Sequence, residues 1–178
     1  MHKPKFLLIL VFVAIQIGGC RSISSKPTEQ DTIAIYQTVI KQIYQTDDTF
    51  GGALEKPILY IIRATNDTIG DPSLQQSTSV VLSDTVQQGI TNVLSNLPTT
   101  IVWVDSWEQV SINPKTGFVE DEGVIITLGN IKYENNDKAL ISASIYVANL
   151  AGGGKTYILE KKDGVWVITG TTGVEWMS

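Results

Sequence analysis

The chain has 178 residues, enough for one domain with a hydrophobic core, and its apolar and charged fractions of 43% and 17% are ordinary for a globular protein. Its formal net charge is -5, and proteins bind nucleic-acid phosphates through lysine and arginine. We therefore expect no nucleic acid among its partners.

Residues 1–19 have the pattern of a secretory signal. Lys3 and Lys5 form a positive amino-terminal region, an apolar run covers residues 6–15, and small residues precede Cys20. The apolar run is too short to cross a bilayer, which takes about 20 residues. We therefore predict that residues 1–19 are a cleaved signal peptide.

Cys20, the only cysteine in the chain, directly follows this signal. The sequence Ile17-Gly18-Gly19-Cys20 resembles the lipobox of bacterial lipoproteins. The resemblance implies cleavage before Cys20, a diacylglycerol on its sulfur and an acylated new amino terminus. These lipids would hold the domain on a bacterial membrane, outside the cytoplasm, because two or more acyl chains anchor a protein stably. A plain cleaved signal peptide is the alternative, and the sequence leaves open which membrane of the envelope is used.

Signal removal changes the chemistry of the chain. It removes His2, the only histidine, and it lowers the formal net charge from -5 to -7 through the loss of Lys3 and Lys5. With Cys20 lipidated, the mature chain has no histidine and no free thiol. A zinc site built from these ligands and a histidine-based acid–base pair are thereby excluded. We expect no metal and no cofactor.

The first half of the mature chain begins with a polar, serine-rich stretch at 20–30, which we interpret as a flexible tether to a single domain at 31–178. Asp31 or Thr32 is the predicted N-cap of an amphipathic helix that ends near Thr46. Further elements are predicted in chain order at 57–64 (a buried strand), 65–76 (a polar loop) and 78–82 (a short strand).

A second helix is predicted after Ser83 or Asp84, and Pro98 would stop it. Gly89 inside this helix costs about 1 kcal/mol relative to alanine, so we expect it to mark close packing on the sheet. Strands follow at 101–110 and 123–133, and then long strands at 139–168. We expect the three glycines at 152–154 to form a bend or a bulge between two of these strands, and the tail at 170–178 to dock through Trp176.

The clearest local signal is Asp163-Gly164 between two β-rich runs, which predicts a hairpin with a type I′ turn. This turn places Lys162 opposite Val165, Lys161 opposite Trp166 and Leu159 opposite Ile168. Period-2 alternation earlier in the same stretch predicts a buried face made of Ile141, Ala143, Ile145 and Val147.

The order of these elements predicts an α+β fold in which the helices lie on one face of the sheet. Residues 157–168 (YILEKKDGVWVI) resemble the closing hairpin of the nuclear transport factor 2-like superfamily, also called cystatin-like. The resemblance implies a curved, mostly antiparallel sheet packed on N-terminal helices around a cone-like pocket. Members include enzymes, binding modules and assembly domains, so the fold does not select a function.

The candidate pocket residues are Trp103, Asp105, Trp107, Tyr133 and Tyr146. Asp105 is predicted to lie mid-strand between two indoles, where partial desolvation would raise its pKa and suit a general base. Solvent exposure of Asp105 and ordinary core packing of the aromatic residues are the alternatives.

Two functions follow from these features. The favoured one is a non-catalytic, lipid-anchored extracytoplasmic domain of the cell envelope that binds a partner protein or an apolar small molecule, with a homodimer through the open sheet as one form. The alternative is a small isomerase, dehydratase or hydrolase that uses Asp105 with a tyrosine.

Overall fold

The structure is a computed structural model that describes residues 27–46, 54–71, 73 and 78–178. The predicted signal peptide, the predicted lipidation site at Cys20 and the predicted tether up to residue 26 lie outside the described residues. The described part contains the helices α1 (Glu29–Thr46) and α2 (Asp84–Leu94), the 3-10 helices η1 (Asp67–Gly70), η2 (Trp107–Gln109) and η3 (Glu120–Glu122), and the strands β1 (Ile58–Ile62), β2 (Thr100–Val104), β3 (Val124–Leu128), β4 (Lys132–Asn135), β5 (Lys138–Ala148), β6 (Ala151–Lys162) and β7 (Val165–Met177).

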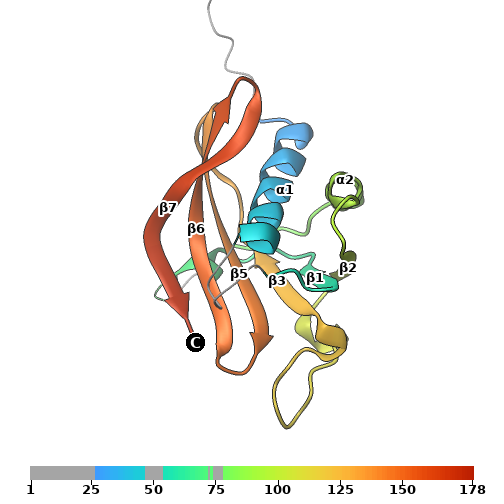
Figure 1. Cartoon of the computed structure of the whole chain (residues 1–178). Helices are drawn as coiled ribbons and strands as arrows, with labels where there is room; N and C mark the ends of the chain where they lie inside the picture. Colours follow the sequence, from blue (N-terminus) through green and yellow to red (C-terminus); the bar gives the residue numbers. More distant parts are fainter. Residues whose placement is uncertain (1–26, 47–53, 72, 74–77) are drawn as a thin grey trace, which may run out of the picture.

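The strands form one seven-stranded open sheet in the order β2-β1-β3-β5-β6-β7, with β4 paired to β5. β1 runs parallel to β2 and to β3, and the other pairs are antiparallel. The predicted α+β class and mostly antiparallel sheet are confirmed. Figure 1 shows α1 beside the long strands β5 to β7, with α2 on the side of β1 and β2.

The main core lies between the helices and one face of the sheet, because alternate strand residues point to opposite faces. Ile61 packs in this core, whereas the next residue, Ile62, packs in a smaller cluster on the other face. The predicted alternation in β5 is confirmed: Ile141, Ala143 and Ile145 are buried in the main core, and Val147 packs against it. The smaller cluster contains Ile62, Val104, Val110, Val119 and Ile125.

The β6–β7 hairpin has the predicted turn and register. Asp163 and Gly164 have φ values of 52° and 81°, the left-handed conformation that a type I′ turn requires at both positions. Lys162 pairs with Val165, Lys161 with Trp166 and Leu159 with Ile168. The turn chemistry and the strand alternation were therefore sufficient to predict this part of the sheet.

Both helix starts are capped by side chains, but the predicted N-cap of α1 was wrong. α1 begins at Glu29, and Asp31 belongs to its first turn. The Asp31 backbone N–H donates to Thr28 Oγ1 at 3.1 Å, and the Thr28 N–H donates to the Asp31 carboxylate at 3.1 Å. This reciprocal pair is a capping box with aspartate in place of glutamate. In α2 the Ser83 cap is confirmed, since its hydroxyl accepts from the Val86 N–H at 3.3 Å.

Four strand predictions need correction. The short strand expected at 78–82 is only an isolated antiparallel bridge between Val81 and Ala64. The strand expected at 101–110 ends at Val104, because the Asp105 N–H donates to Gln109 Oε1 at 2.7 Å and the chain turns into η2. The strand expected at 123–133 is two strands, β3 and β4. The glycines at 152–154 form neither a bend nor a bulge: they lie inside β6, in consecutive register with residues 144–146, and the connection from β5 is at 149–150.

Two contacts explain the roles of individual glycines. A Cβ on Gly154 would lie 2.2 Å from the backbone oxygen of Ile69 and 2.4 Å from Trp176 Nε1, so position 154 of β6 has room only for glycine. Gly89 does mark close packing, but against α1 instead of the sheet, because a Cβ there would lie 2.4 Å from Ile33 Cδ1.

The carboxyl-terminal tail docks as predicted. It forms the end of β7, and the Ser178 N–H donates to the Gly152 carbonyl at 2.9 Å. Trp176 Nε1 donates to the carbonyl of Ile69 at 2.6 Å.

Candidate functional site

The five candidate pocket residues do not line a common pocket, because the sheet separates them. Trp103 is on the helix side, where its Nε1 donates to Thr91 Oγ1 of α2 at 3.0 Å. Tyr133 is also on the helix side and lies edge-on to Trp166, with ring centroids 6.2 Å apart.

Trp107 and Tyr146 belong to the opposite face. The centroids of their rings are 4.8 Å apart in an edge-to-face arrangement, and the Tyr146 hydroxyl donates to the Gly117 carbonyl at 3.0 Å. Tyr146 packs against the smaller cluster, so these two aromatic side chains have the ordinary packing role that was the alternative.

Asp105 does not lie between two indoles, as the uninterrupted strand would have required. Its side chain is 63% exposed, and its carboxylate pairs with Arg63 Nη1 at 3.0 Å and accepts from Gln109 Nε2 at 3.3 Å. Asp105 is therefore not desolvated, as the proposed role of general base would have required.

The space between α1 and the sheet, where a cone-like pocket would lie, is occupied by side chains. Ile40, Leu159 and Trp166 are at most 3% exposed there. Tyr36 is also buried in this layer, and its hydroxyl donates to the Gly129 carbonyl at 3.1 Å. Over the described residues, this layer is a packed core.

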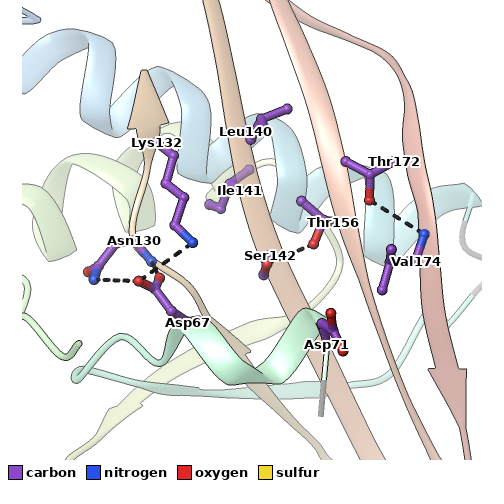
Figure 2. Close-up of a pocket in the computed structure, with 10 residues that line it drawn as sticks. All are labelled: Asp67, Asp71, Asn130, Lys132, Leu140, Ile141, Ser142, Thr156, Thr172 and Val174. Atoms are coloured by element: carbon purple, nitrogen blue, oxygen red, sulfur yellow. Dashed lines mark hydrogen bonds and ion pairs between the residues drawn. The ribbon is translucent and has the colours of Figure 1, made fainter. Parts of the chain in front are cut away.

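A hollow of about 180 Å³ lies instead on the opposite face of the sheet, between η1 and strands β4 to β7 (Figure 2). Its floor includes Ser142 of β5 and Thr156 of β6, whose hydroxyl oxygens are 2.8 Å apart. Gly70 packs directly on these hydroxyls, since a Cβ there would lie 2.4 Å from Ser142 Oγ. The two hydroxyls are therefore part of the contact that holds η1 on the sheet.

Asp67 is an acidic side chain of the hollow that has several polar partners. Its carboxylate accepts from Thr78 Oγ1 at 2.7 Å and from the Asn130 N–H at 2.8 Å, and Lys132 Nζ lies 3.8 Å away. Burial raises the pKa of Asp67. The hydrogen bonds from Thr78 and Asn130 and the charge of Lys132 together lower it by more than burial raises it, so the pKa lies below the ordinary value. Asp67 is therefore a stable anion whose acceptor capacity is used inside the protein.

Asp71 lies at the other end of η1, and Figure 2 shows its side chain apart from that of Asp67. Hydrogen bonds from the Ser73 hydroxyl and N–H, at 2.6 Å and 2.9 Å, lower the pKa of Asp71. The two carboxylates do not converge, and both are ionised at neutral pH. This arrangement is unlike an acid–base pair, in which one carboxyl keeps its proton.

A second hollow, of about 490 Å³, lies between α1 and α2. Its lining is mostly uncharged and polar, including Gln37, Gln42 and Gln45, and Lys41 supplies its positive charge. An acid–base pair needs two titratable groups with separated pKa values, which this lining does not bring together.

The Asp67 network was not predicted because its members come from a predicted loop and from the interior of a predicted strand. The signal that could have found it is Gly129-Asn130, a turn-forming pair inside an otherwise β-rich run. The side chain of Asn130 also donates to Thr78 Oγ1 at 2.8 Å, which ties this break to the segment after the loop.

Among the described residues, no cluster of three or more histidine, cysteine, aspartate or glutamate side chains is arranged to hold a metal. The helices in the same part of the chain are all too short or too polar to cross a bilayer. Comparison with known proteins gives no match, either to a family model or to a curated protein.

Proposed function

We propose that this chain is a lipid-anchored, non-catalytic domain of the bacterial cell envelope, of the nuclear transport factor 2-like type, and that it binds a partner protein. The lipobox resemblance at Cys20 supports the anchor. The packing of α1 on the long antiparallel strands that end in the YILEKKDGVWVI hairpin supports the superfamily.

The observation that carries the choice of a partner protein is the filled layer under α1. An apolar small molecule would need an enclosed apolar cavity, since such ligands are mostly buried when bound. Ile40, Leu159 and Trp166 occupy the layer where that cavity would lie. The exterior of the domain is then the surface left for binding, and a partner protein is the ligand class that fits it.

No observation favours the alternative enzyme. Its proposed base, Asp105, lies at the end of β2 in solvent, beside Arg63. Pairing of the open sheet face with a second copy is a form of the binding proposal. Sedimentation of a signal-less Cys20→Ser chain tests it, and a monomer at high concentration would exclude it.

The anchor also constrains how the domain sits. α1 begins nine residues after Cys20, and nine extended residues reach about 30 Å at most. The end of the domain that contains the start of α1 would thus stay near the membrane surface.

Membrane fractionation of cells that express the full chain tests the anchor. We expect Cys20→Ser to move the protein to the soluble fraction and to abolish incorporation of labelled palmitate. The matched control Ser22→Ala, in the same tether, should stay in the membrane fraction and keep its label. Membrane retention of Cys20→Ser equal to that of the control would refute the proposal.

A further inference from the structure

The domain has two ends with different surfaces. The start of α1 and the β6–β7 turn share one end, where Asp31 bonds to Trp166 and Lys161. The β5–β6 turn and the end of β7 lie at the other end of the long strands (Figure 1). If the anchor is as proposed above, the first end faces the membrane and the second faces away from it.

Three large apolar side chains are exposed at the far end, which we call the distal tip: Phe118 (54% exposed), Leu150 (87%) and Met177 (69%). Their segments are neighbours. The Val119 N–H donates to the Val147 carbonyl at 3.0 Å, next to the turn that contains Leu150, and Met177 pairs with Gly153 just after that turn. Exposed apolar side chains that adjoin one another on a surface mark interaction sites, whereas singly scattered ones do not.

The backbone at this end is strained in a way that favours the same interpretation. Leu150 has a φ of 59°, a conformation that suits glycine or asparagine and that a branched side chain rarely adopts. Asp121 and Glu122, near Phe118, have φ values of 57° and 54°. Local structure rules tend to be broken at functional sites, and here glycine would form the turn at lower cost than an exposed leucine.

We propose that the distal tip is the docking surface for the partner protein, which would offer an apolar cleft bordered by lysine or arginine. This rests on the function proposed above. The charge requirement comes from Glu120, Asp121 and Glu122, which are exposed beside Phe118. The same carboxylates oppose a second copy bound tip to tip and an anionic membrane surface, because like charges repel.

Site-specific photo-cross-linking of the full, anchored chain in the bacterium that makes it is the first step of the test. Benzoylphenylalanine replaces Leu150 in one variant and Val165 in the other. Val165 is 62% exposed at the opposite end of the domain, so it is also accessible to a probe, as Leu150 is. We expect one discrete protein adduct from position 150 and none from position 165.

The second step uses the captured protein in purified form with the full chain in detergent. Leu150→Gly should weaken binding about tenfold or more, as for a buried anchor residue, while Val165→Gly should leave it unchanged. The thermal midpoint of Leu150→Gly should be equal to or above that of the wild type, because glycine relieves the positive φ, so misfolding cannot explain the loss. The triple change Glu120→Gln, Asp121→Asn, Glu122→Gln should also weaken binding and flatten its salt dependence.

The contrary outcomes are an adduct of two copies, an adduct with lipid alone, equal adducts at both positions, no adduct, or unchanged affinity of Leu150→Gly. Each would overturn the docking surface. The anchor is tested separately: if Cys20→Ser stays on the membrane while Leu150→Gly loses the partner, the anchor fails and the tip stands.

Discussion

The carboxylate of Asp31 accepts a hydrogen bond from Trp166 Nε1 at 2.9 Å, joining the first turn of α1 to the last hairpin across 135 residues of sequence. Lys161, opposite Trp166 in the register, reaches the same carboxylate oxygen at 2.6 Å. The Lys161 ammonium also lies 5.7 Å from the centroid of the Trp166 ring, so both groups contact each other as well as Asp31. This cluster closes the end of the domain at which α1 begins.

Asp31→Asn should therefore lower the free energy of unfolding by about 2 kcal/mol, because hydrogen bonds to a charged group contribute about 1.5–3 kcal/mol. Urea unfolding followed by tryptophan fluorescence measures this difference. Asp163→Asn is the matched control, since asparagine suits the left-handed turn position and removes an exposed carboxylate. Equal destabilisation by the two changes would show that Asp31 has no special role.

The same cluster predicts a pH dependence. The hydrogen bond from Lys161 holds the pKa of Asp31 well below its ordinary value, against the opposing effect of burial, and the bonds from Trp166 and Thr28 add to the shift. A carboxyl whose pKa is lower in the folded state contributes stability above its unfolded pKa of about 3.9 and loses it as pH falls toward the folded pKa. The stability difference between wild type and Asp31→Asn should thus be constant from pH 7 to 5 and shrink below about pH 4. A difference that stays constant down to pH 2 would contradict this assignment.

Gly154 and Gly170 make a matched pair of substitutions in adjacent strands. Gly154→Ala places a methyl group 2.2 Å from the Ile69 carbonyl oxygen, and that backbone atom cannot move without displacing η1. We expect a loss of about 2 kcal/mol or more from overpacking. Gly170→Ala meets nothing within 4 Å and has no positive φ, so it should be neutral or slightly stabilising. Thermal unfolding of both variants decides the question, and similar midpoints would mean that η1 is not held against β6.

The features that could be predicted from the sequence are those determined by residues close together in the chain. The β6–β7 register follows from Asp163-Gly164 and from alternation, both visible within twelve residues, and it is confirmed. The end of β2 depends on the bond from the Asp105 N–H to the Gln109 side chain, which no periodicity reports. The placement of Asp105 between two indoles on one face of the sheet assumed a strand that continues to residue 110. Because β2 ends at Val104, the placements of both Asp105 and Trp107 are wrong.

The glycines of β6 also show that contacts between distant segments could not be predicted from the local sequence. Glycine in a strand usually indicates a bulge or a bend, and one of these was predicted at 152–154. Position 154 requires glycine for another reason: the Ile69 carbonyl and Trp176, from segments distant in sequence, pack directly against its Cα. Likewise Asp67 meets Asn130 only through the fold, so the hollow of Figure 2 could not be predicted from either segment alone.

Asp67 and Asp105 allow a direct comparison between a mostly buried, hydrogen-bonded carboxylate and an exposed one. The Asp67 side chain is 12% exposed and accepts the Asn130 N–H and the Thr78 hydroxyl, whereas the Asp105 side chain is 63% exposed beside Arg63. Replacing Asp67 by asparagine substitutes an amide donor for one acceptor oxygen and leaves buried donors without a partner, at a cost of about 1–3 kcal/mol.

Asp105→Asn removes a solvent-exposed ion pair, which contributes less than about 1 kcal/mol. Chemical unfolding at neutral pH should therefore rank Asp67→Asn well below Asp105→Asn in stability. Because the Asp67 carboxylate is already ionised with a lowered pKa, its contribution should persist through the neutral range and fall only under acid conditions. If Asp67→Asn were as stable as Asp105→Asn, the network between η1 and β4 would not be what holds this side of the sheet together. The hollow would then be better explained as a site kept open for a ligand.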